Sequence, residues 1–125
     1  MREVISTTDA PPSIGPFSQA IRANGFVYVS GQVALDPSTR TVIEGDISAQ
    51  TERTIENVAA ILRAAGSGLD KVVSARVFLI DMNEFSAMNA VYSRYFASEP
   101  PARTTIEVSR LPLDVRVEID VVALA

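Results

Sequence analysis

The sequence predicts an α+β fold in which two helices cover one face of a sheet of five or six strands. Several runs of apolar or alternating residues have the length and the turn-forming flanks of strands. Between them lie two segments whose apolar residues recur every three or four positions, the spacing of amphipathic helices. With 125 residues, 47% of them hydrophobic, the chain suits one domain, residues 1–125, with a substantial core.

The first half of the chain predicts a hairpin. The dipeptide Asn24-Gly25 is typical of a tight turn and joins the expected strands at 20–23 and 26–30. Gly31 interrupts the second strand, which indicates a β-bulge or a close approach of the backbone. A further short edge strand is expected at 41–43.

Capping signals mark both helices. Asp46 or Ser48 is expected to cap the first helix, and Gly66 to end it in a left-handed conformation. A strand that is apolar on both faces follows at residues 71–80. The second helix is expected to start at Asp81, which stands three residues before Glu84 as in a capping box. Its buried side is expected to carry Phe85, Met88, Tyr92 and Tyr95 or Phe96.

One face of the sheet lacks a cover. Two helices can pack on only one face, yet the strands at 26–30, 72–80 and 115–124 are apolar on both. A symmetric oligomer is the expected answer for a small chain. The alternative is a loosely covered sheet with a wet face, which the bulky residues of the 72–80 strand disfavour.

Composition excludes several kinds of chemistry and of partner. Without cysteine or histidine there is no disulfide, thiol nucleophile or Ser-His-Asp triad, and no spaced carboxylate cluster suggests a metal site. A net charge of −4 without a basic stripe argues against nucleic acid as a partner. No run approaches the roughly 20 apolar residues of a membrane span, and the N-terminus lacks the apolar core of a signal peptide. We therefore expect a cytoplasmic protein that does not bind membranes.

The C-terminal quarter carries the candidate site. It is interpreted as two strands joined at Leu111-Pro112, a hairpin that would place Thr105 near Glu118 and Arg103 near Asp120. A guanidinium and a carboxylate on one rigid face suit a small carboxylic acid, because guanidinium binds carboxylate bidentately and a carboxylate can act on a water. The alternative is a solvated face with ordinary ion pairs.

Short segments spread over nearly the full length add a resemblance. They are Ala10-Pro11 with residues 14–20, then Val29-Ser30-Gly31-Gln32, residues 54–58 and 77–82, Asn89-Ala90-Val91-Tyr92, Pro101-Ala102-Arg103, residues 108–112, and Val117-Glu118-Ile119-Asp120. In this order and spacing the chain resembles the RidA family, also called YjgF-like proteins, known as 2-iminobutanoate/2-iminopropanoate deaminases.

The resemblance implies both an architecture and a reaction. The architecture is a chorismate-mutase-like α+β domain with a mixed sheet, assembled as a homotrimer around a central barrel, with one site in each cleft between subunits. The reaction is the hydrolysis of reactive 2-imino acids to 2-keto acids and ammonia. These small molecules would be the partners, and neither a metal nor an organic cofactor would be needed.

The same resemblance assigns roles to residues. Arg103 would bind the substrate carboxylate, and Glu118 would orient the attacking water or move its proton. Backbone groups around Gly31 and Thr105 would hydrogen-bond the substrate. The remaining substrate-binding candidates are Phe17, Ser30 and Asn89.

Structural alternatives stay open for these residues. Arg103 could be a surface arginine, Glu118 a paired structural carboxylate, Gly31 a simple bulge and Asn89 a partner in a helix-to-strand hydrogen bond. Many family members have tyrosine where this chain has Phe17, and if that hydroxyl positions substrate or water, activity would fall or substrate preference would shift.

A further departure from the family pattern is Thr105, which stands where many members have cysteine. The runner-up function is a non-catalytic trimer that binds small carboxylates as a sensor or regulatory module. It would use Arg103 but would need no oriented water at Glu118. A nuclease fits poorly with the acidic balance and the missing histidine.

Overall fold

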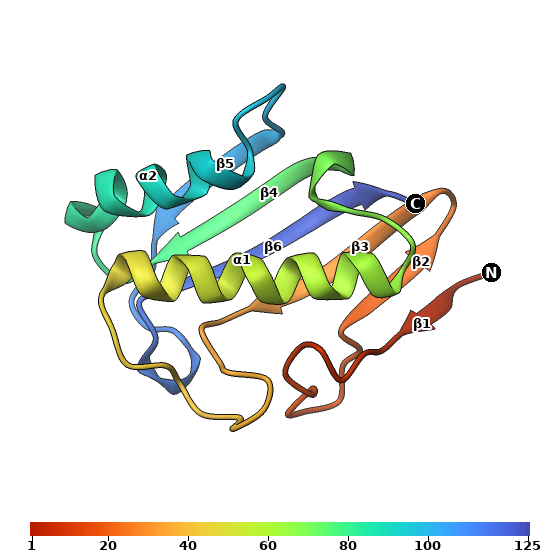
Figure 1. Ribbon diagram of the computed structural model, residues 1–125, viewed down its shortest axis with the longest axis horizontal. Helices are drawn as coiled ribbons and strands as arrows, with labels where there is room; N and C mark the ends of the chain where they lie inside the picture. Colours follow the sequence, from red (N-terminus) through yellow and green to blue (C-terminus); the bar gives the residue numbers. More distant parts are fainter.

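The computed structural model describes all 125 residues. They form one six-stranded sheet in the order β1-β2-β3-β6-β4-β5, with two helices against one face (Figure 1). The strands and helices are β1 (Glu3–Ile5), β2 (Ala20–Ala23), β3 (Phe26–Gln32), α1 (Ile47–Ala64), β4 (Val72–Leu79), α2 (Phe85–Tyr95), β5 (Ala102–Glu107) and β6 (Val117–Leu124). Only β4 and β5 are parallel, so the sheet is mixed and the predicted α+β fold is confirmed.

The predicted turn and bulge in the first half are both present. Asn24 and Gly25 have φ angles of 51° and 82°, the left-handed values that the two central residues of a tight hairpin require. Between Val29 and Gln32 the register against β6 shifts, so β3 holds one extra residue around Gly31. The expected edge strand at 41–43 is reduced to an isolated bridge between Leu35 and Val42.

Asp46, not Ser48, caps α1. Its carboxylate accepts a hydrogen bond from the backbone N–H of Ala49 at 3.0 Å. At the other end, the chain leaves the helix through Gly66, whose φ is 77°. Both ends of α1 therefore follow from local sequence.

The start of α2 differs from the capping-box prediction, which is wrong. Asp81 caps a single 3₁₀ turn (Met82–Glu84) by accepting from the backbone N–H of Asn83, and α2 begins only at Phe85. Glu84 does not reach back to the cap, because its carboxylate accepts a hydrogen bond from the Arg116 guanidinium at 2.9 Å. An ion pair with a distant segment thus takes the place of the local hydrogen bond that a capping box would make.

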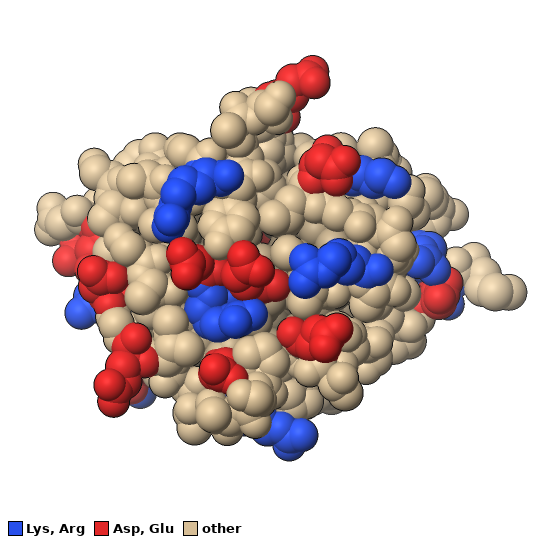
Figure 2. Space-filling view, in the orientation of Figure 1, with Lys and Arg blue, Asp and Glu red and all other residues tan.

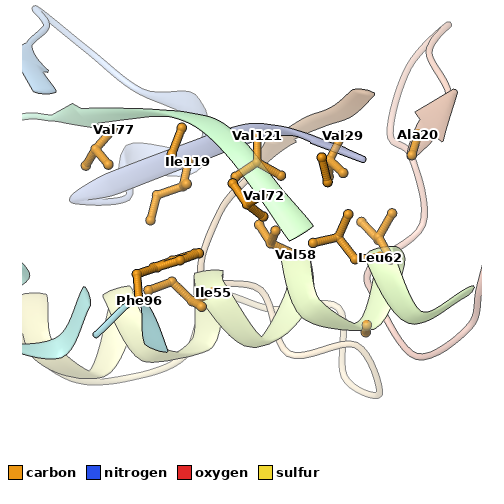
Figure 3. Packing of buried hydrophobic residues seen from close by; sticks show 14 of the residues in the cluster. Ala20, Val29, Ile55, Val58, Leu62, Val72, Val77, Phe96, Ile119 and Val121 are labelled. Atoms are coloured by element: carbon orange, nitrogen blue, oxygen red, sulfur yellow. The ribbon is translucent and has the colours of Figure 1, made fainter. Parts of the chain in front are cut away.

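The core lies between the sheet and the helices. Figure 3 shows Ile55, Val58 and Leu62 of α1 pointing toward the apolar side chains of the sheet. On α2 the buried residues include Met88 and Tyr92, as its apolar spacing predicts. Neither helix is both long and apolar enough to span a bilayer.

The opposite face of the sheet has no cover within the chain. Tyr28 of β3 and Ile106 of β5 keep 47% and 43% of their surface exposed. The same face carries an ion pair in which the Arg76 guanidinium donates to both carboxylate oxygens of Asp120, at 2.9 and 2.7 Å. The predicted uncovered face is therefore present, and the oligomer expected to cover it stays a prediction.

The predicted C-terminal hairpin is wrong, because β4 lies between β5 and β6. These two strands do run in opposite directions, as in a hairpin. Alternating apolar residues indicate a strand but not its partner, and the 108–116 connection is long enough to pass the end of β4. Thr105 is therefore not opposite Glu118. Arg103 is likewise not opposite Asp120.

Replacing the α1 cap tests this account of the helix. Asp46→Ala should lower the free energy of unfolding by about 1 kcal/mol, because the Ala49 N–H loses its acceptor. Ser48→Ala, the control, should change it by less than about 0.5 kcal/mol. Urea unfolding followed by circular dichroism measures both, and equal losses would contradict the assignment of the cap.

Candidate active site

The predicted site residues fall into two groups on opposite faces of the sheet. Residues directly opposite each other in paired strands share a face. Glu118 pairs with Phe78 of β4, whereas Thr105 pairs with the preceding residue, Val77. Because side chains alternate along a strand, Glu118 lies on the uncovered face, and Thr105 and Arg103 lie on the helix face.

Glu118 lies in an apolar cavity of about 190 Å³ at one end of the sheet. Two loops supply the walls: Ile14 and Phe17 come from the proline-rich loop before β2, and Leu113 from the turn before β6. These three side chains are each about half exposed or more. Burial in this setting raises the pKa of Glu118, and the neighbouring Asp120 carboxylate adds to the shift.

Gly31 makes room for the Glu118 carboxyl group. A Cβ atom at Gly31 would lie 2.9 Å from Cδ of Glu118 and closer still to one of its oxygens. The bulge therefore gives the glutamate its place, because only a residue without a side chain leaves that space free. The bulge at Gly31 is thus confirmed, and its contact with a substrate stays a prediction.

Buried amides hold the cavity walls, and they were not among the predicted site residues. Gln19 donates to the carbonyl of Pro11 at 2.8 Å. Asn57, on α1 and fully buried, donates to the carbonyls of Val33 and Leu35 at 3.0 and 2.9 Å. From the sequence alone, these two buried amides cannot be distinguished from amides that are exposed on the surface, because only the fold shows that they bond to loop carbonyls.

Ser30 has a supporting role of the same kind. Its hydroxyl donates to the carbonyl of Ser18 at 2.6 Å, next to the loop that carries Phe17. Phe17 lines the cavity, and its contact with a substrate stays a prediction. Ser30 therefore shapes the cavity from behind and does not line it.

Arg103 forms the second group, with Asn89 and Tyr92 beside it around a shallow cavity of about 500 Å³. Its guanidinium carbon lies 4.6 Å from the centroid of the Tyr92 ring and 5.5 Å from that of Phe85. Burial raises the pKa of the Tyr92 hydroxyl, and the positive charge of Arg103 opposes that shift. The apolar spacing of α2 predicts Tyr92 as a core residue and gives no sign of its contact with Arg103.

The structural alternative for Glu118, an ion pair with a buried arginine, is not present. Asp120, not Glu118, pairs with an arginine on this face, and Glu118 has neither an ion pair nor a hydrogen bond within the chain. Arg103 also has no ion pair, and the Tyr92 hydroxyl lies beside its guanidinium as an uncharged acceptor. The chain thus presents an unpaired cation and an unpaired carboxylate, each facing a cavity.

Comparisons with known proteins identify relatives that match the chain over nearly its whole length. The profile of the family described as Endoribonuclease L-PSP matches residues 7–125. A RutC family protein of Pyrococcus horikoshii is 50% identical over 123 residues, covering 98% of each chain. A mouse protein named 2-iminobutanoate/2-iminopropanoate deaminase is 43% identical over 124 residues, covering 99% of this chain and 92% of its own.

Solved structures share the whole fold. The Rid family protein YyfA of Yersinia pestis superposes with a TM-score of 0.97 at 43% identity, covering 100% of both chains. Escherichia coli TdcF, solved with bound serine, superposes with a TM-score of 0.93 at 36% identity, covering 98% of both chains.

The contact between Gly31 and Glu118 predicts a coupled pair. Gly31→Ala should lower the free energy of unfolding by about 1 kcal/mol, because the end of the Glu118 side chain must move away from the new methyl group. In a Glu118→Ala background the same change should cost much less, since the overlapping group is gone. Urea unfolding of the four proteins of this cycle measures the coupling, and equal costs in both backgrounds would contradict it.

The raised pKa of Glu118 predicts a pH-dependent effect on stability. The folded state binds this proton more tightly than the unfolded state, so the ionised carboxylate destabilises the fold above the folded pKa. That penalty shrinks as pH falls through the folded pKa and vanishes below the ordinary value of 4.5. Glu118→Gln should therefore unfold at a higher temperature than wild type at about pH 8 and at the same temperature at about pH 4.

Thermal unfolding across this pH range measures the difference between Glu118→Gln and wild type. Glu44→Gln, which removes an exposed carboxylate without a hydrogen bond, is the control and should show no such trend. A Glu118→Gln protein that is less stable than wild type at about pH 8 would show that the ionised carboxylate contributes to the fold.

Proposed function

The chain belongs to the RidA/YjgF family, whose profile is described as Endoribonuclease L-PSP, and we propose that it hydrolyses reactive 2-imino acids to 2-keto acids and ammonia. One observation carries the proposal: Arg103 and Glu118 are both partly buried and both lack a partner in the chain. Charged groups in such settings are costly unless a ligand or a reaction uses them. The name of the mouse relative supports the same reaction.

The opposite faces of Arg103 and Glu118 support a site between subunits. Within one chain the sheet itself separates the two side chains, so both can contact one small substrate only if they come from different copies. The uncovered apolar face offers the surface through which copies would associate. We propose a homotrimer in which each cleft combines the Glu118 cavity of one subunit with the Arg103 cavity of its neighbour.

The proposed mechanism uses two side chains and one water. The Arg103 guanidinium binds the substrate carboxylate and leaves carbon C2 beside Glu118. Glu118 accepts a proton as water attacks C2, which forms the C–O bond and moves the C=N electron pair onto nitrogen. Return of that proton to nitrogen gives a carbinolamine, which carries a hydroxyl and an amino group on C2. Glu118 then moves the hydroxyl proton to the amino group, so the keto C=O forms as the C–N bond breaks and ammonia leaves. The raised pKa of Glu118 brings its basicity closer to neutral pH, which favours this transfer.

The walls around Glu118 indicate which substituent the substrate carries. Carbon C2 of a 2-imino acid bears the carboxylate, the nitrogen and the side chain. With C2 beside Glu118, the side chain lies against Ile14, Phe17 and Leu113, which offer no charge and no hydroxyl. This favours aliphatic imines such as 2-iminopropanoate and 2-iminobutanoate.

The other two functions explain less of the structure. A non-catalytic carboxylate-binding protein would use Arg103, but it gives no role to the desolvated Glu118. An RNA-cleaving protein, as the name of the profile suggests, would need a cationic surface. The helix-covered face instead carries basic and acidic side chains interspersed (Figure 2), and the net charge is −4.

Imine decay tests the proposal. With 2-iminobutanoate generated in situ, wild type should accelerate release of the keto acid. Arg103→Ala should lower kcat/KM by about 100-fold through the lost carboxylate contact, and Glu118→Gln should lower kcat by about 100-fold or more through the lost base. Arg63→Ala, which removes an exposed arginine without a partner, should act like wild type. A wild type without effect on decay would overturn the deaminase assignment.

Mixing the two inactive variants tests the intersubunit site. If Arg103 and Glu118 come from different subunits, subunits exchanged between Arg103→Ala and Glu118→Gln rebuild intact sites. Random mixing in equal amounts makes about one site in four intact, since each donor is wild type with a chance of about one half. If both residues came from one chain, the mixture would stay as inactive as its components.

A further inference from the structure

The setting of Arg103 differs from that of every other arginine in the chain. Three arginines are half-buried, and the other two have hydrogen-bond partners: Arg22 bonds to Glu3, and Arg53 to Asn57. The remaining arginines without a partner are exposed to solvent, namely Arg2, Arg40 and Arg63. Arg103 alone is held away from solvent without a carboxylate, an amide or a backbone carbonyl as its partner, so something other than an ion pair stabilises its charge.

Two aromatic rings on one side of α2 stabilise the charge of Arg103 instead. Tyr92 and Phe85 are seven residues apart, two turns of a helix, so both rings face β5. The guanidinium carbon of Arg103 lies 4.6 Å and 5.5 Å from their centroids, within the range of cation–π attraction. The Tyr92 ring is itself immobilised, because it is 5% exposed and stacks on Phe96 at 4.5 Å.

We call the rings of Tyr92 and Phe85 the aromatic seat of Arg103. This seat has a property that a carboxylate partner lacks. The face of a ring attracts the positive charge, but it offers no strong acceptor and so occupies none of the five guanidinium N–H donors. A carboxylate of the protein at this position would pair with Arg103 and compete with any ligand. The rings therefore keep the guanidinium ordered, partly desolvated and available, which is the condition of a preorganised binding group.

We propose that Tyr92, supported by Phe85, is a positioning residue that holds the Arg103 guanidinium ready for the carboxylate of a 2-keto or 2-imino acid. The inference rests on the proposed function only in that Arg103 binds a carboxylate. It requires no turnover, so it can hold where the proposed reaction fails. Tyr92 acts through Arg103, and its effect is on carboxylate affinity and not on the chemical step.

The chain contains a matched control for this role. Tyr95 lies three residues further along α2, and its hydroxyl donates to the Glu56 carboxylate at 2.9 Å. Burial and this carboxylate raise the pKa of Tyr95 to about 12. Its ring lies under no arginine, so substitutions at Tyr95 change the helix surface without changing the seat of Arg103.

Binding of 2-oxobutanoate, measured by calorimetry, tests the inference. Tyr92→Leu should raise Kd by about tenfold or more, because the closer ring is lost, whereas Tyr92→Phe should stay within about threefold of wild type. Phe85→Leu should have a smaller effect than Tyr92→Leu, since its ring lies farther from the guanidinium. Tyr95→Leu should bind as wild type does. The uncharged 2-oxobutanamide should bind weakly and equally to all of them.

Kinetics separates positioning from catalysis and from misfolding. Tyr92→Leu should raise KM for the imine with little change in kcat at saturation. Unchanged Kd in Tyr92→Leu and Phe85→Leu would overturn the inference, as would a wild type that fails to bind 2-oxobutanoate. If Tyr92→Leu fails to fold, Phe85→Leu decides by the same criterion. If the wild type hydrolyses no imine but Kd follows the predicted series, the deaminase proposal fails and the aromatic seat stands.

Discussion

The position of β4 between β5 and β6 is the constraint on which the candidate site depends. It places Glu118 on the uncovered face of the sheet and Arg103 on the helix face. Had β5 and β6 formed the predicted hairpin, the guanidinium and the carboxylate would lie side by side. Two opposite charges at contact distance would then form an ion pair and need no ligand. The inserted strand keeps both groups unpaired within the chain, and in the proposed trimer each subunit would need its neighbour to complete a site.

Leaving Glu118 and Arg103 unpaired lowers the stability of the fold. The structure around each of them reduces this loss in a different way. Glu118 is accommodated by a glycine bulge in β3 and by walls that buried amides fasten to α1 and to the proline-rich loop. Arg103 is accommodated by aromatic rings of α2. In both cases the supporting residues lie in regular elements or are tied to them, which keeps the reactive groups in one geometry. The polar residues buried in α1, among them Asn57, are thus part of the site's support and not defects of the core.

Local features were predictable because they depend on neighbours in sequence. The turn at Asn24-Gly25, the bulge at Gly31 and the cap of α1 each follow from one or two residues with restricted or permissive backbones. The capping box at Asp81 failed for the opposite reason, because Glu84 found Arg116 from a distant segment. The burial of Tyr92 was predictable from the apolar spacing of α2. Its contact with Arg103 was not, because apolar spacing does not show which groups a buried ring contacts.

By itself, the sequence determined the α+β class, the boundaries that turns and caps impose, the apolar second face and the residue types available for chemistry. These properties arise from periodicity and composition, which are local. Only the tertiary structure decided which strands pair, and with that the faces on which Arg103 and Glu118 lie. Strand pairing is a long-range choice, since an alternating segment satisfies its hydrogen bonds equally well beside any strand whose direction and burial match.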